Sequence, residues 1–437
     1  ALIRRDASSG FGRNNRFGYF PAVSAAWVVS DESFFHPGIV EFMKVRASYG
    51  VSGNDKIGLF RYRALLGGEG VYPFNDQLVT GVAIGTLGNQ DLKWETTHQT
   101  NIGIDFTLLN GKLDITTDYY IKKTNDLLFQ PDISAISGAY GAGGNPPYVN
   151  GGDVKNSGFE FAIHYNDRVG EDFTFNIGYN LTTIRNRVTA LPKGVDFYEF
   201  GAFGVGGGTA TRMQVGYPMG YFFGYKTDGV YQSTQEIAER GVTQPDAKPG
   251  DLRYKDIDKN GSIDFSNDTD KTMIGSPIPK VIMGLNLGMN FKGFDFSTTF
   301  YASLGNKILR NYERQLPMAN LLAYKMNRWT GPGSTNSEPR LTTDLTRNGV
   351  ISDYFVEDGS FVRIKNIQLG YTLPSSLSKR IGATKLRLYI AANNLATFTK
   401  YRGYDPDFSS SNPLVSGIDY GYYPQAKTYM AGLNLNF

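Results

Sequence analysis

The residues with the clearest potential for chemistry are oxygen-bearing side chains in the segment 256–264, which reads Asp-Ile-Asp-Lys-Asn-Gly-Ser-Ile-Asp. Oxygen ligands at positions 1, 3, 5 and 9, glycine at position 6 and a backbone carbonyl at position 7 are the pattern of an EF-hand-like calcium loop. The sequence therefore predicts a structural Ca²⁺ site in a loop. Its ligands would be the side chains of Asp256, Asp258, Asn260 and Asp264 and the carbonyl of Ser262.

The end of this loop departs from the calcium pattern. Position 12, where a bidentate glutamate is expected, is Asn267, a poor substitute. Asp268 or Asp270 could close the ligand shell if the loop is longer than the standard one, and we take Asp268 as the candidate ligand. The alternative interpretation is a solvated acidic turn that holds no metal.

Aromatic side chains in the predicted loops are candidates for contacting a substrate, because sugar rings stack on aromatic faces and peptides pack against them. We predict substrate contacts at Tyr140, Tyr148, Tyr198 and Phe203. The segment 401–423 carries more aromatic residues. For any single aromatic, packing between loops or a place in an interfacial girdle is the commoner role.

Nothing in the composition indicates an enzyme or a nucleic-acid partner. The 437 residues include no cysteine, which excludes disulfides, thiolate nucleophiles and Cys-ligated metals. His36, His98 and His164 lack the spacing of metal ligands, and no G-x-S-x-G motif occurs. The 44 Lys and Arg nearly balance 41 Asp and Glu, so we expect no nucleic acid to bind. We predict a protein that is not an enzyme.

The elements that must position these loops are long strands with alternating side chains. In 281–291 every odd-numbered residue is apolar, whereas the even-numbered residues after Ile282 are Gly or Asn. Similar alternation runs through 94–108, 159–166 and the C-terminal 429–437. Each strand therefore has one apolar and one polar face. Such strands suit a barrel closed in lipid, which needs no apolar run of about 18 residues.

Short and long connections alternate between these strands. Short turns are expected at Asn110-Gly111, at 167–170 and at Lys292-Gly293. The pattern predicts an all-β, transmembrane antiparallel β-barrel with short turns at the periplasmic rim and long loops outside. Consistent strand directions require a tight turn at 216–220, which gives about fourteen strands. The long irregular stretches are near 53–91, 129–152, 188–212, 229–277, 305–354 and 400–423.

Several stretches along the chain, in a consistent order, resemble the SusC/RagA type of TonB-dependent outer-membrane transporter. One is Leu92-Lys-Trp-Glu-Thr96, and another is Gly152-Asp-Val-Lys-Asn-Ser-Gly-Phe-Glu160. The other matching stretches are 14–27, 119–128, 220–229, 393–395 and the terminal strand. The family also carries an Asp/Asn-rich segment before a Thr-x-Ile-Gly stretch, which is Thr272-Met-Ile-Gly275 here.

The resemblance implies that residues 1–437 are the C-terminal portion of a 22-stranded plugged barrel. The N-terminal strands, the plug and the TonB-contact segment would lie outside this chain, which fits the absence of a signal peptide at Ala1. The implied function is TonB-dependent active import of a nutrient, an oligosaccharide or a peptide, across the outer membrane of a Gram-negative, Bacteroidetes-like bacterium.

The resemblance also implies three kinds of partner. A SusD-like surface lipoprotein would act as a lid, the TonB complex would engage the N-terminal part, and outer-membrane lipid would surround the barrel. The alternative function is a passive porin or a surface-binding outer-membrane barrel.

Overall fold

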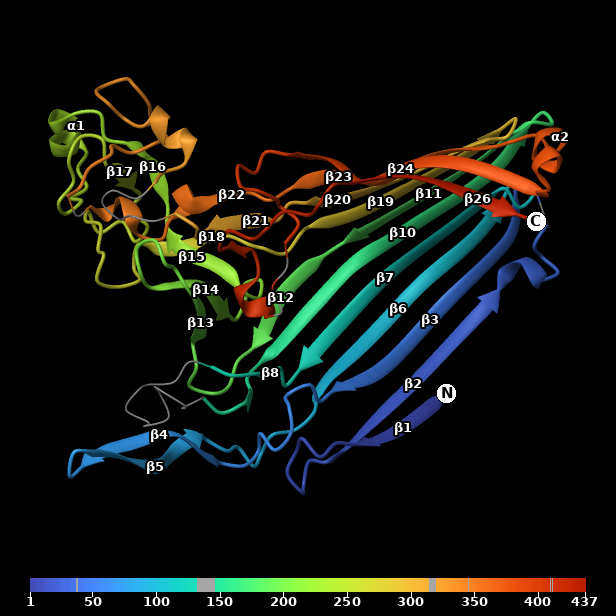
Figure 1. The fold of residues 1–437 in the computed structure, drawn as a ribbon. Helices are drawn as coiled ribbons and strands as arrows, with labels where there is room; N and C mark the ends of the chain where they lie inside the picture. Colours follow the sequence, from blue (N-terminus) through green and yellow to red (C-terminus); the bar gives the residue numbers. More distant parts are fainter. Residues whose placement is uncertain (37, 132–145, 314–319, 345, 409, 411) are drawn as a thin grey trace.

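The computed structural model describes residues 1–36, 38–131, 146–313, 320–344, 346–408, 410 and 412–437. Its largest element is a 13-stranded sheet of long strands that lie side by side (Figure 1). β12 (Arg185–Ala190) pairs with β10, off the main path. That path follows β1 (Leu2–Ala7), β2 (Phe17–Val28), β3 (Val40–Asn54), β6 (Glu95–Leu108), β7 (Leu113–Asn125), β10 (Asp153–Val169), β11 (Phe173–Thr183), β19 (Val281–Phe291), β20 (Phe294–Leu304), β23 (Phe361–Thr372), β24 (Lys385–Thr399) and β26 (Thr428–Asn436).

The two faces of this sheet differ in chemistry, as the alternation predicts. Ile102 lies directly across from Ala47 on one side and Tyr119 on the other. The Ile102 and Tyr119 side chains are 56% and 49% exposed, so this apolar face has no protein cover. We call it the outer face. On the opposite, inner face, Arg46 pairs with Asp105 at 2.8 Å and with Asp118 at 2.9 Å.

One glycine of the inner face leaves space for an ion pair that spans three strands. Gly103 lies between Arg46 of β3 and Asp118 of β7 in the strand register. A Cβ atom at Gly103 would lie 2.1 Å from the Asp118 Oδ1 atom. The absence of a side chain at this position therefore lets the Arg46 guanidinium cross β6.

The long connections fold into a head at one end of the sheet (Figure 1). We use "the head" for three small sheets and α1 (Thr234–Glu239). The first sheet contains β13 (Phe197–Ala202), β14 (Thr209–Gln214), β15 (Tyr221–Tyr225) and β18 (Lys271–Gly275). The second pairs β16 (Thr227–Val230) with β17 (Leu252–Tyr254), and the third contains β22 (Val356–Asp358), β21 (Lys307–Arg310) and β25 (Ile418–Asp419).

The remaining elements are short. β4 (Leu65–Phe74) and β5 (Gln77–Thr86) form a separate hairpin, and β8 (Leu128–Phe129) pairs with β9 (Val149–Asn150). α2 (Ser375–Ser378) lies at the end of the sheet away from the head (Figure 1). Among the described residues, no helix is both long and apolar enough to cross a membrane. The 3₁₀ turns are Val29–Asp31, Ala323–Asn327, Arg347–Gly349, Asp353–Phe355, Lys379–Ile381 and Pro413–Val415.

The structure corrects the expected placement of the turn at 216–220 among the barrel strands. The 13 strands of the main sheet agree with the expected count of about fourteen. β14 and β15 do pair across this turn, but they belong to the head rather than to the 13-stranded sheet. Most of their side chains are buried regardless of parity, because head segments cover both of their faces. Both strands leave the barrel together, so the alternation of strand directions is preserved.

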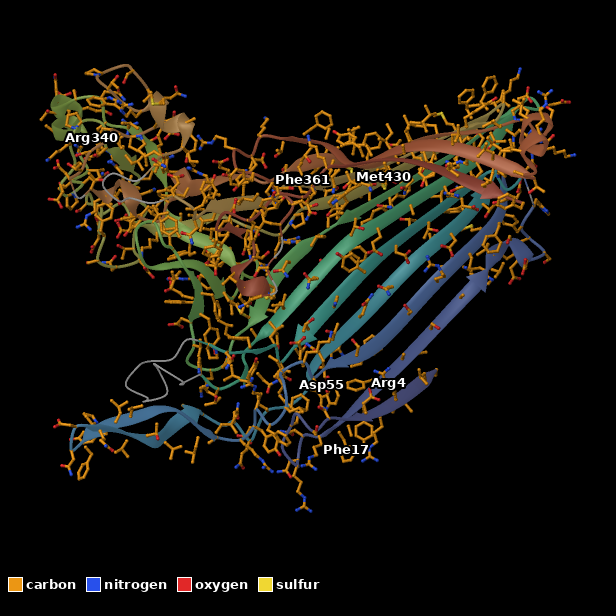
Figure 2. All side chains as sticks on the ribbon, in the orientation of Figure 1. Arg4, Phe17, Asp55, Arg340, Phe361 and Met430 are labelled. Carbon is orange, nitrogen blue, oxygen red and sulfur yellow. The ribbon has the colours of Figure 1, made fainter. Side chains whose placement is uncertain are left out.

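Two of the packed core clusters lie in the head. One cluster contains Phe203, Phe222, Leu309 and Phe355, and a second contains Tyr225, Tyr254 and Ile263. Arg340, labelled in Figure 2, joins two head segments through an ion pair with Asp251 at 2.8 Å. The head therefore has the buried interior of a water-soluble domain.

Candidate functional site

The acidic segment 256–264 folds as a tight loop in the head, after β17. Asp256 accepts hydrogen bonds from the Lys259 and Gly261 N–H groups at 2.7 and 2.8 Å. Lys259 and Gly261 adopt φ angles of 62° and 88°, which curl the backbone around the Asp256 carboxylate. The glycine expected at position 6 therefore occupies a left-handed conformation, where a side chain would be strained.

Two further predicted ligands support successive turns of the same loop. An Asp258 oxygen accepts a hydrogen bond from the Asn260 N–H at 3.0 Å. The Asn260 side-chain oxygen accepts one from the Ser262 N–H at 2.8 Å. Each bond reaches two residues ahead, as in an Asx turn. The loop is thus held by side chains that still have free lone pairs on their oxygens.

Asp270 completes the acidic group. Carboxylate oxygens of Asp256, Asp258 and Asp270 lie within 4.8 Å of one another. Asp270 is fully buried and accepts hydrogen bonds from the Ile257 N–H at 2.9 Å and the Asp264 N–H at 2.8 Å. Of the two residues that the sequence offered for closing the shell, the structure brings Asp270 to the group.

Asp268 and Asp264 lie outside this group. Asp268 pairs with Arg212 at 2.5 Å and with Lys271 at 2.9 Å, which corrects its assignment as a ligand. Asp264 accepts hydrogen bonds from the N–H and hydroxyl of Ser266, both at 2.7 Å. Residues 264–269 therefore form a second turn, in which the Asp264 and Asp268 carboxylates have partners outside the acidic group.

The Asp268 pair joins the acidic loop to the four-stranded sheet. Arg212 of β14 also pairs with Glu199 of β13 at 2.5 Å. Its guanidinium lies over the rings of Phe197 and Phe223, 3.7 and 3.5 Å from their centroids. Cation–π contacts of this kind stabilise the positive charge of the Arg212 guanidinium at this position. The sequence offered no signal for Arg212, because its partners are distant along the chain.

The loop is anchored in the head by Ile263, which is position 8 of the loop. Ile263 is completely buried beside Tyr225 and Tyr254. Its N–H donates to the Thr243 carbonyl at 2.8 Å, and the Tyr225 hydroxyl donates to the Asp264 carbonyl at 3.0 Å. The acidic group is therefore mounted on the packed core of the head.

Hydrogen bonds favour the ionised form of two loop carboxylates, Asp256 and Asp264. Desolvation raises the pKa of Asp256, but hydrogen bonds from the Gly261 and Lys259 N–H groups outweigh it, and the pKa lies below its usual value. Hydrogen bonds from Ser266 likewise lower the pKa of Asp264. Three hard oxygen donors from ionised or hydrogen-bonded carboxylates match the preference of Ca²⁺.

The predicted substrate aromatics do not form one surface. Tyr148 packs on the cluster of Phe11, Ile57 and Leu92, and Tyr198 packs edge-on against Phe129 at 5.1 Å between ring centroids. Phe203 is 1% exposed and packs against Phe355, so its ring belongs to the head core, which corrects its assignment to substrate. Tyr140 lies outside the described residues.

The last long connection brings other aromatic residues together. Phe408 and Tyr422 stack with centroids 5.1 Å apart, and Tyr420 meets Tyr422 edge-on. Tyr423 is 92% exposed, and Tyr404 is also exposed. We call Tyr404, Phe408, Tyr420, Tyr422 and Tyr423 the aromatic group. Tyr401, in contrast, is buried and donates a hydrogen bond to Asp419.

A buried ionic cluster ties three head segments together, and the sequence did not reveal it. Arg310 Nε lies 2.8 Å from Glu357 Oε1, and Arg402 Nε lies 2.9 Å from the same oxygen. Lys325 Nζ lies 3.2 Å from Glu313 Oε2. Glu338 pairs with both Arg402 and Lys325, at 3.2 and 3.6 Å. The ionic cluster therefore consists of Arg310, Glu313, Lys325, Glu338, Glu357 and Arg402.

Burial perturbs one base of the ionic cluster. Desolvation lowers the pKa of Lys325 to about 8, although Glu338 acts in the opposite direction. The charge of this side chain therefore changes within an accessible pH range.

Comparisons with known proteins agree with this architecture. A family model described as "TonB dependent receptor-like, beta-barrel" matches residues 3–395. The chain is 36% identical to TonB-dependent receptor P3 of Formosa agariphila, over 99% of this chain and 43% of that protein. It is 32% identical to TonB-dependent receptor SusC of Bacteroides thetaiotaomicron, over 100% of this chain and 42% of that protein.

A solved structure described as the RagAB peptide transporter superposes with a TM-score of 0.80 and 26% identity. That match covers 100% of this chain and 45% of the other chain. The chain thus spans less than half the length of these relatives.

Proposed function

The chain belongs to the TonB-dependent receptor β-barrel family, and we propose that it supplies part of the barrel wall and the outer loops of a nutrient importer. The observation that carries the proposal is the family match over residues 3–395, on a sheet with an apolar outer face and a charged inner face. An apolar outer face suits contact with lipid, and a polar inner face suits a plugged, hydrated lumen.

Further parts of the importer would come from outside these residues. We propose that additional strands close the barrel, that a plug fills its lumen, and that the TonB complex drives transport through an N-terminal segment. A SusD-like surface lipoprotein would cover the head. Support comes from the similarity to SusC and RagAB, of which this chain spans less than half.

The proposed substrate is an oligosaccharide or a peptide. The solved RagAB structure is described as a peptide transporter, which supports a peptide. The aromatic group supports either substrate, since sugar rings stack on aromatic faces and peptides pack against them. Tyr148 and Tyr198 remain candidates for substrate contacts.

Uptake by cells that carry the full-length gene tests the proposed function. Labelled oligosaccharides and peptides are supplied with and without a protonophore, and in a strain that lacks TonB. We expect cells to accumulate one of the two substrate classes. This accumulation should stop when the protonophore is added and in the strain that lacks TonB. Equilibration that continues without TonB or proton-motive force would instead indicate the passive porin. Residues 1–437 produced alone are expected to give no coupled uptake.

We also propose that the acidic loop binds Ca²⁺ as a structural clamp on the head. Asp256, Asp258 and Asp270 would provide carboxylate ligands, and Asn260 and the Ser262 carbonyl lie in the same loop. Bound Ca²⁺ would offset the repulsion between the carboxylates that the loop gathers. The buried Ile263 anchor would then transmit this stabilisation to the head core.

Calorimetric titration of the EDTA-treated full-length protein with Ca²⁺ tests the clamp. We expect binding that Asp256→Asn and Asp258→Asn each weaken by about tenfold or more. The matched control is Asp246→Asn, because the Asp246 side chain is 77% exposed and lies outside the acidic group. Equal binding by all three variants would rule out this loop as the site.

A further inference from the structure

The outer face carries a row of basic side chains near the rim that leads to the head. In the strand register His98 of β6 lies across from Lys123 of β7, and Lys123 lies across from Lys155 of β10. Lys155 lies across from Arg187 of β12, and Arg185 is two residues away on that strand. We call these five residues the basic row.

The basic row shares its face with the apolar band. Lys123 has the same parity as Tyr119, and Lys155 has the same parity as Phe159. The register between β6, β7 and β10 continues without a shift from one pair to the other. Since Tyr119 and Phe159 are exposed apolar side chains, the basic row lies directly beyond the lipid-facing band.

The head covers the other face of this rim. Val154 and Val188, which neighbour Lys155 and Arg187 in the chain, are buried in a head cluster with Met213. Alternation therefore leaves the basic side chains on the outer face, and Lys123, Arg185 and Arg187 are exposed. The basic row is thus not part of the head interior.

The charges of the basic row are not neutralised by neighbouring carboxylates. Among the ion pairs of the described residues, none involves Lys123, Lys155, Arg185 or Arg187. The Arg187 side chain donates a hydrogen bond to the Gly216 carbonyl at 2.9 Å, and the Tyr49 hydroxyl lies 2.8 Å from His98 Nδ1. A tyrosine hydroxyl beside the row is typical of a headgroup zone.

We propose that the basic row binds the phosphate groups of an anionic lipid in the leaflet that surrounds the long-loop rim. Long basic side chains keep their stems on apolar surface and extend their charged ends to the headgroup level. Several adjacent cations at that level recognise anionic headgroups. The proposal goes beyond nutrient import and rests on the membrane placement proposed above.

Native mass spectrometry of the full-length protein in detergent tests this proposal with a doubly phosphorylated lipid A and its dephosphorylated form. We expect retention of the phosphorylated lipid only. A Lys123→Gln, Lys155→Gln, Arg187→Gln triple variant should weaken binding by about fivefold for each charge removed, or roughly 100-fold in all. A Lys123→Arg, Lys155→Arg double variant keeps all the charges and should bind the phosphorylated lipid with the affinity of the wild-type protein.

The matched control is Lys122→Gln, which removes a charge from the inner face beside Lys123 and should leave lipid binding unchanged. Equal retention of both lipid forms by the wild-type protein would overturn the proposal, whether or not the variants fold. The proposal would also be overturned if Lys122→Gln weakened binding of the phosphorylated lipid as much as the triple variant does. Flotation of the protein with vesicles measures membrane insertion separately, so failure of the membrane placement itself is distinguished from failure of the lipid site.

Discussion

The main sheet and the head place the same kinds of side chain in opposite environments. Ile102 and Tyr119 stay exposed on the outer face of the sheet, whereas Phe203 and Tyr254 are buried in the head. Charged groups show the same contrast, because Arg46 lies on the open inner face of the sheet whereas Arg310 is enclosed in the head. The sheet is therefore suited to lipid on its outer face and to water on its inner face, whereas the head is suited to water alone.

The difference shows where each region obtains its stability. Strands of the sheet are held by backbone ladders and by lipid contact, so a single outer side chain contributes little packing. The head depends on close-packed aromatic clusters and on buried ion pairs, each of which draws on distant segments. Substitutions should thus have different effects in the two regions even when the residue type is the same.

The largest expected effect is that of Phe203→Ala in the head. Loss of a fully buried ring should destabilise the head by about 3–5 kcal/mol. Hydrogen exchange measured by mass spectrometry should show faster exchange in β13, β14 and β22, with the main sheet unchanged. The exposed Tyr423→Ala is the control and should change neither region. Faster exchange throughout the sheet would contradict the separation of the two regions.

The next effect concerns the outer face. Ile102→Arg would place a charge within the lipid-facing band and should destabilise the inserted protein by about 2–4 kcal/mol. Urea titration of the full-length protein in vesicles measures this change. Asn101→Arg, one residue away on the inner face, should be nearly neutral. If the two variants are destabilised equally, the assignment of the faces is wrong.

A pH effect should be confined to the head. Below about pH 8, Lys325 is charged in both the folded and the unfolded state, and the free-energy cost of burying its charge fully reduces the stability of the folded head. Between about pH 8 and pH 10.5 the folded state has lost its proton while the unfolded state retains it. The unfolded state then binds more protons, so head stability should rise with pH, by up to about 3 kcal/mol.

Thermal unfolding followed by Trp329 fluorescence at several pH values measures this rise. Lys325→Met should remove it, because no titrating group remains at that position. Lys248→Met is the control, since the Lys248 side chain is 62% exposed. A rise that persists in Lys325→Met would have to come from another group.

The smallest expected effect tests the inner face. Gly103→Ala would push the Asp118 carboxylate away from Arg46 and should cost about 1–2 kcal/mol. The control is Gly178→Ala on β11, where an added Cβ would lie 3.5 Å from its nearest neighbour. The urea titration used for Ile102→Arg compares the two. Equal midpoints would show that the pair across three strands contributes nothing measurable.

Much of the sheet could be predicted from alternation alone, because a two-residue period is a local property. The odd-numbered residues of 281–291 lie on one face of β19, as expected. The turn at 216–220 was wrongly placed among the barrel strands for the same reason. Its hairpin pairs locally like a barrel hairpin, but burial of both faces by distant head segments places it in the head.

The candidate site also has one part that follows from local sequence and another that depends on distant residues. The turn geometry of Asp256 and Gly261 follows from neighbouring residues, so the motif predicted it. The choice between Asp268 and Asp270 depended on Arg212, which lies more than one strand away and attracts the first of them. Local spacing carries no information about such a partner.

By itself, the sequence determined the two-faced strands, the alternation of short and long connections and the curled acidic loop. These features arise from interactions between residues that are close in the chain. Only the tertiary structure decided that Phe203 is enclosed, that Asp270 joins Asp256, and that the basic side chains of four strands meet in one row. Each of these depends on the register and packing of segments far apart in sequence, which no single stretch encodes.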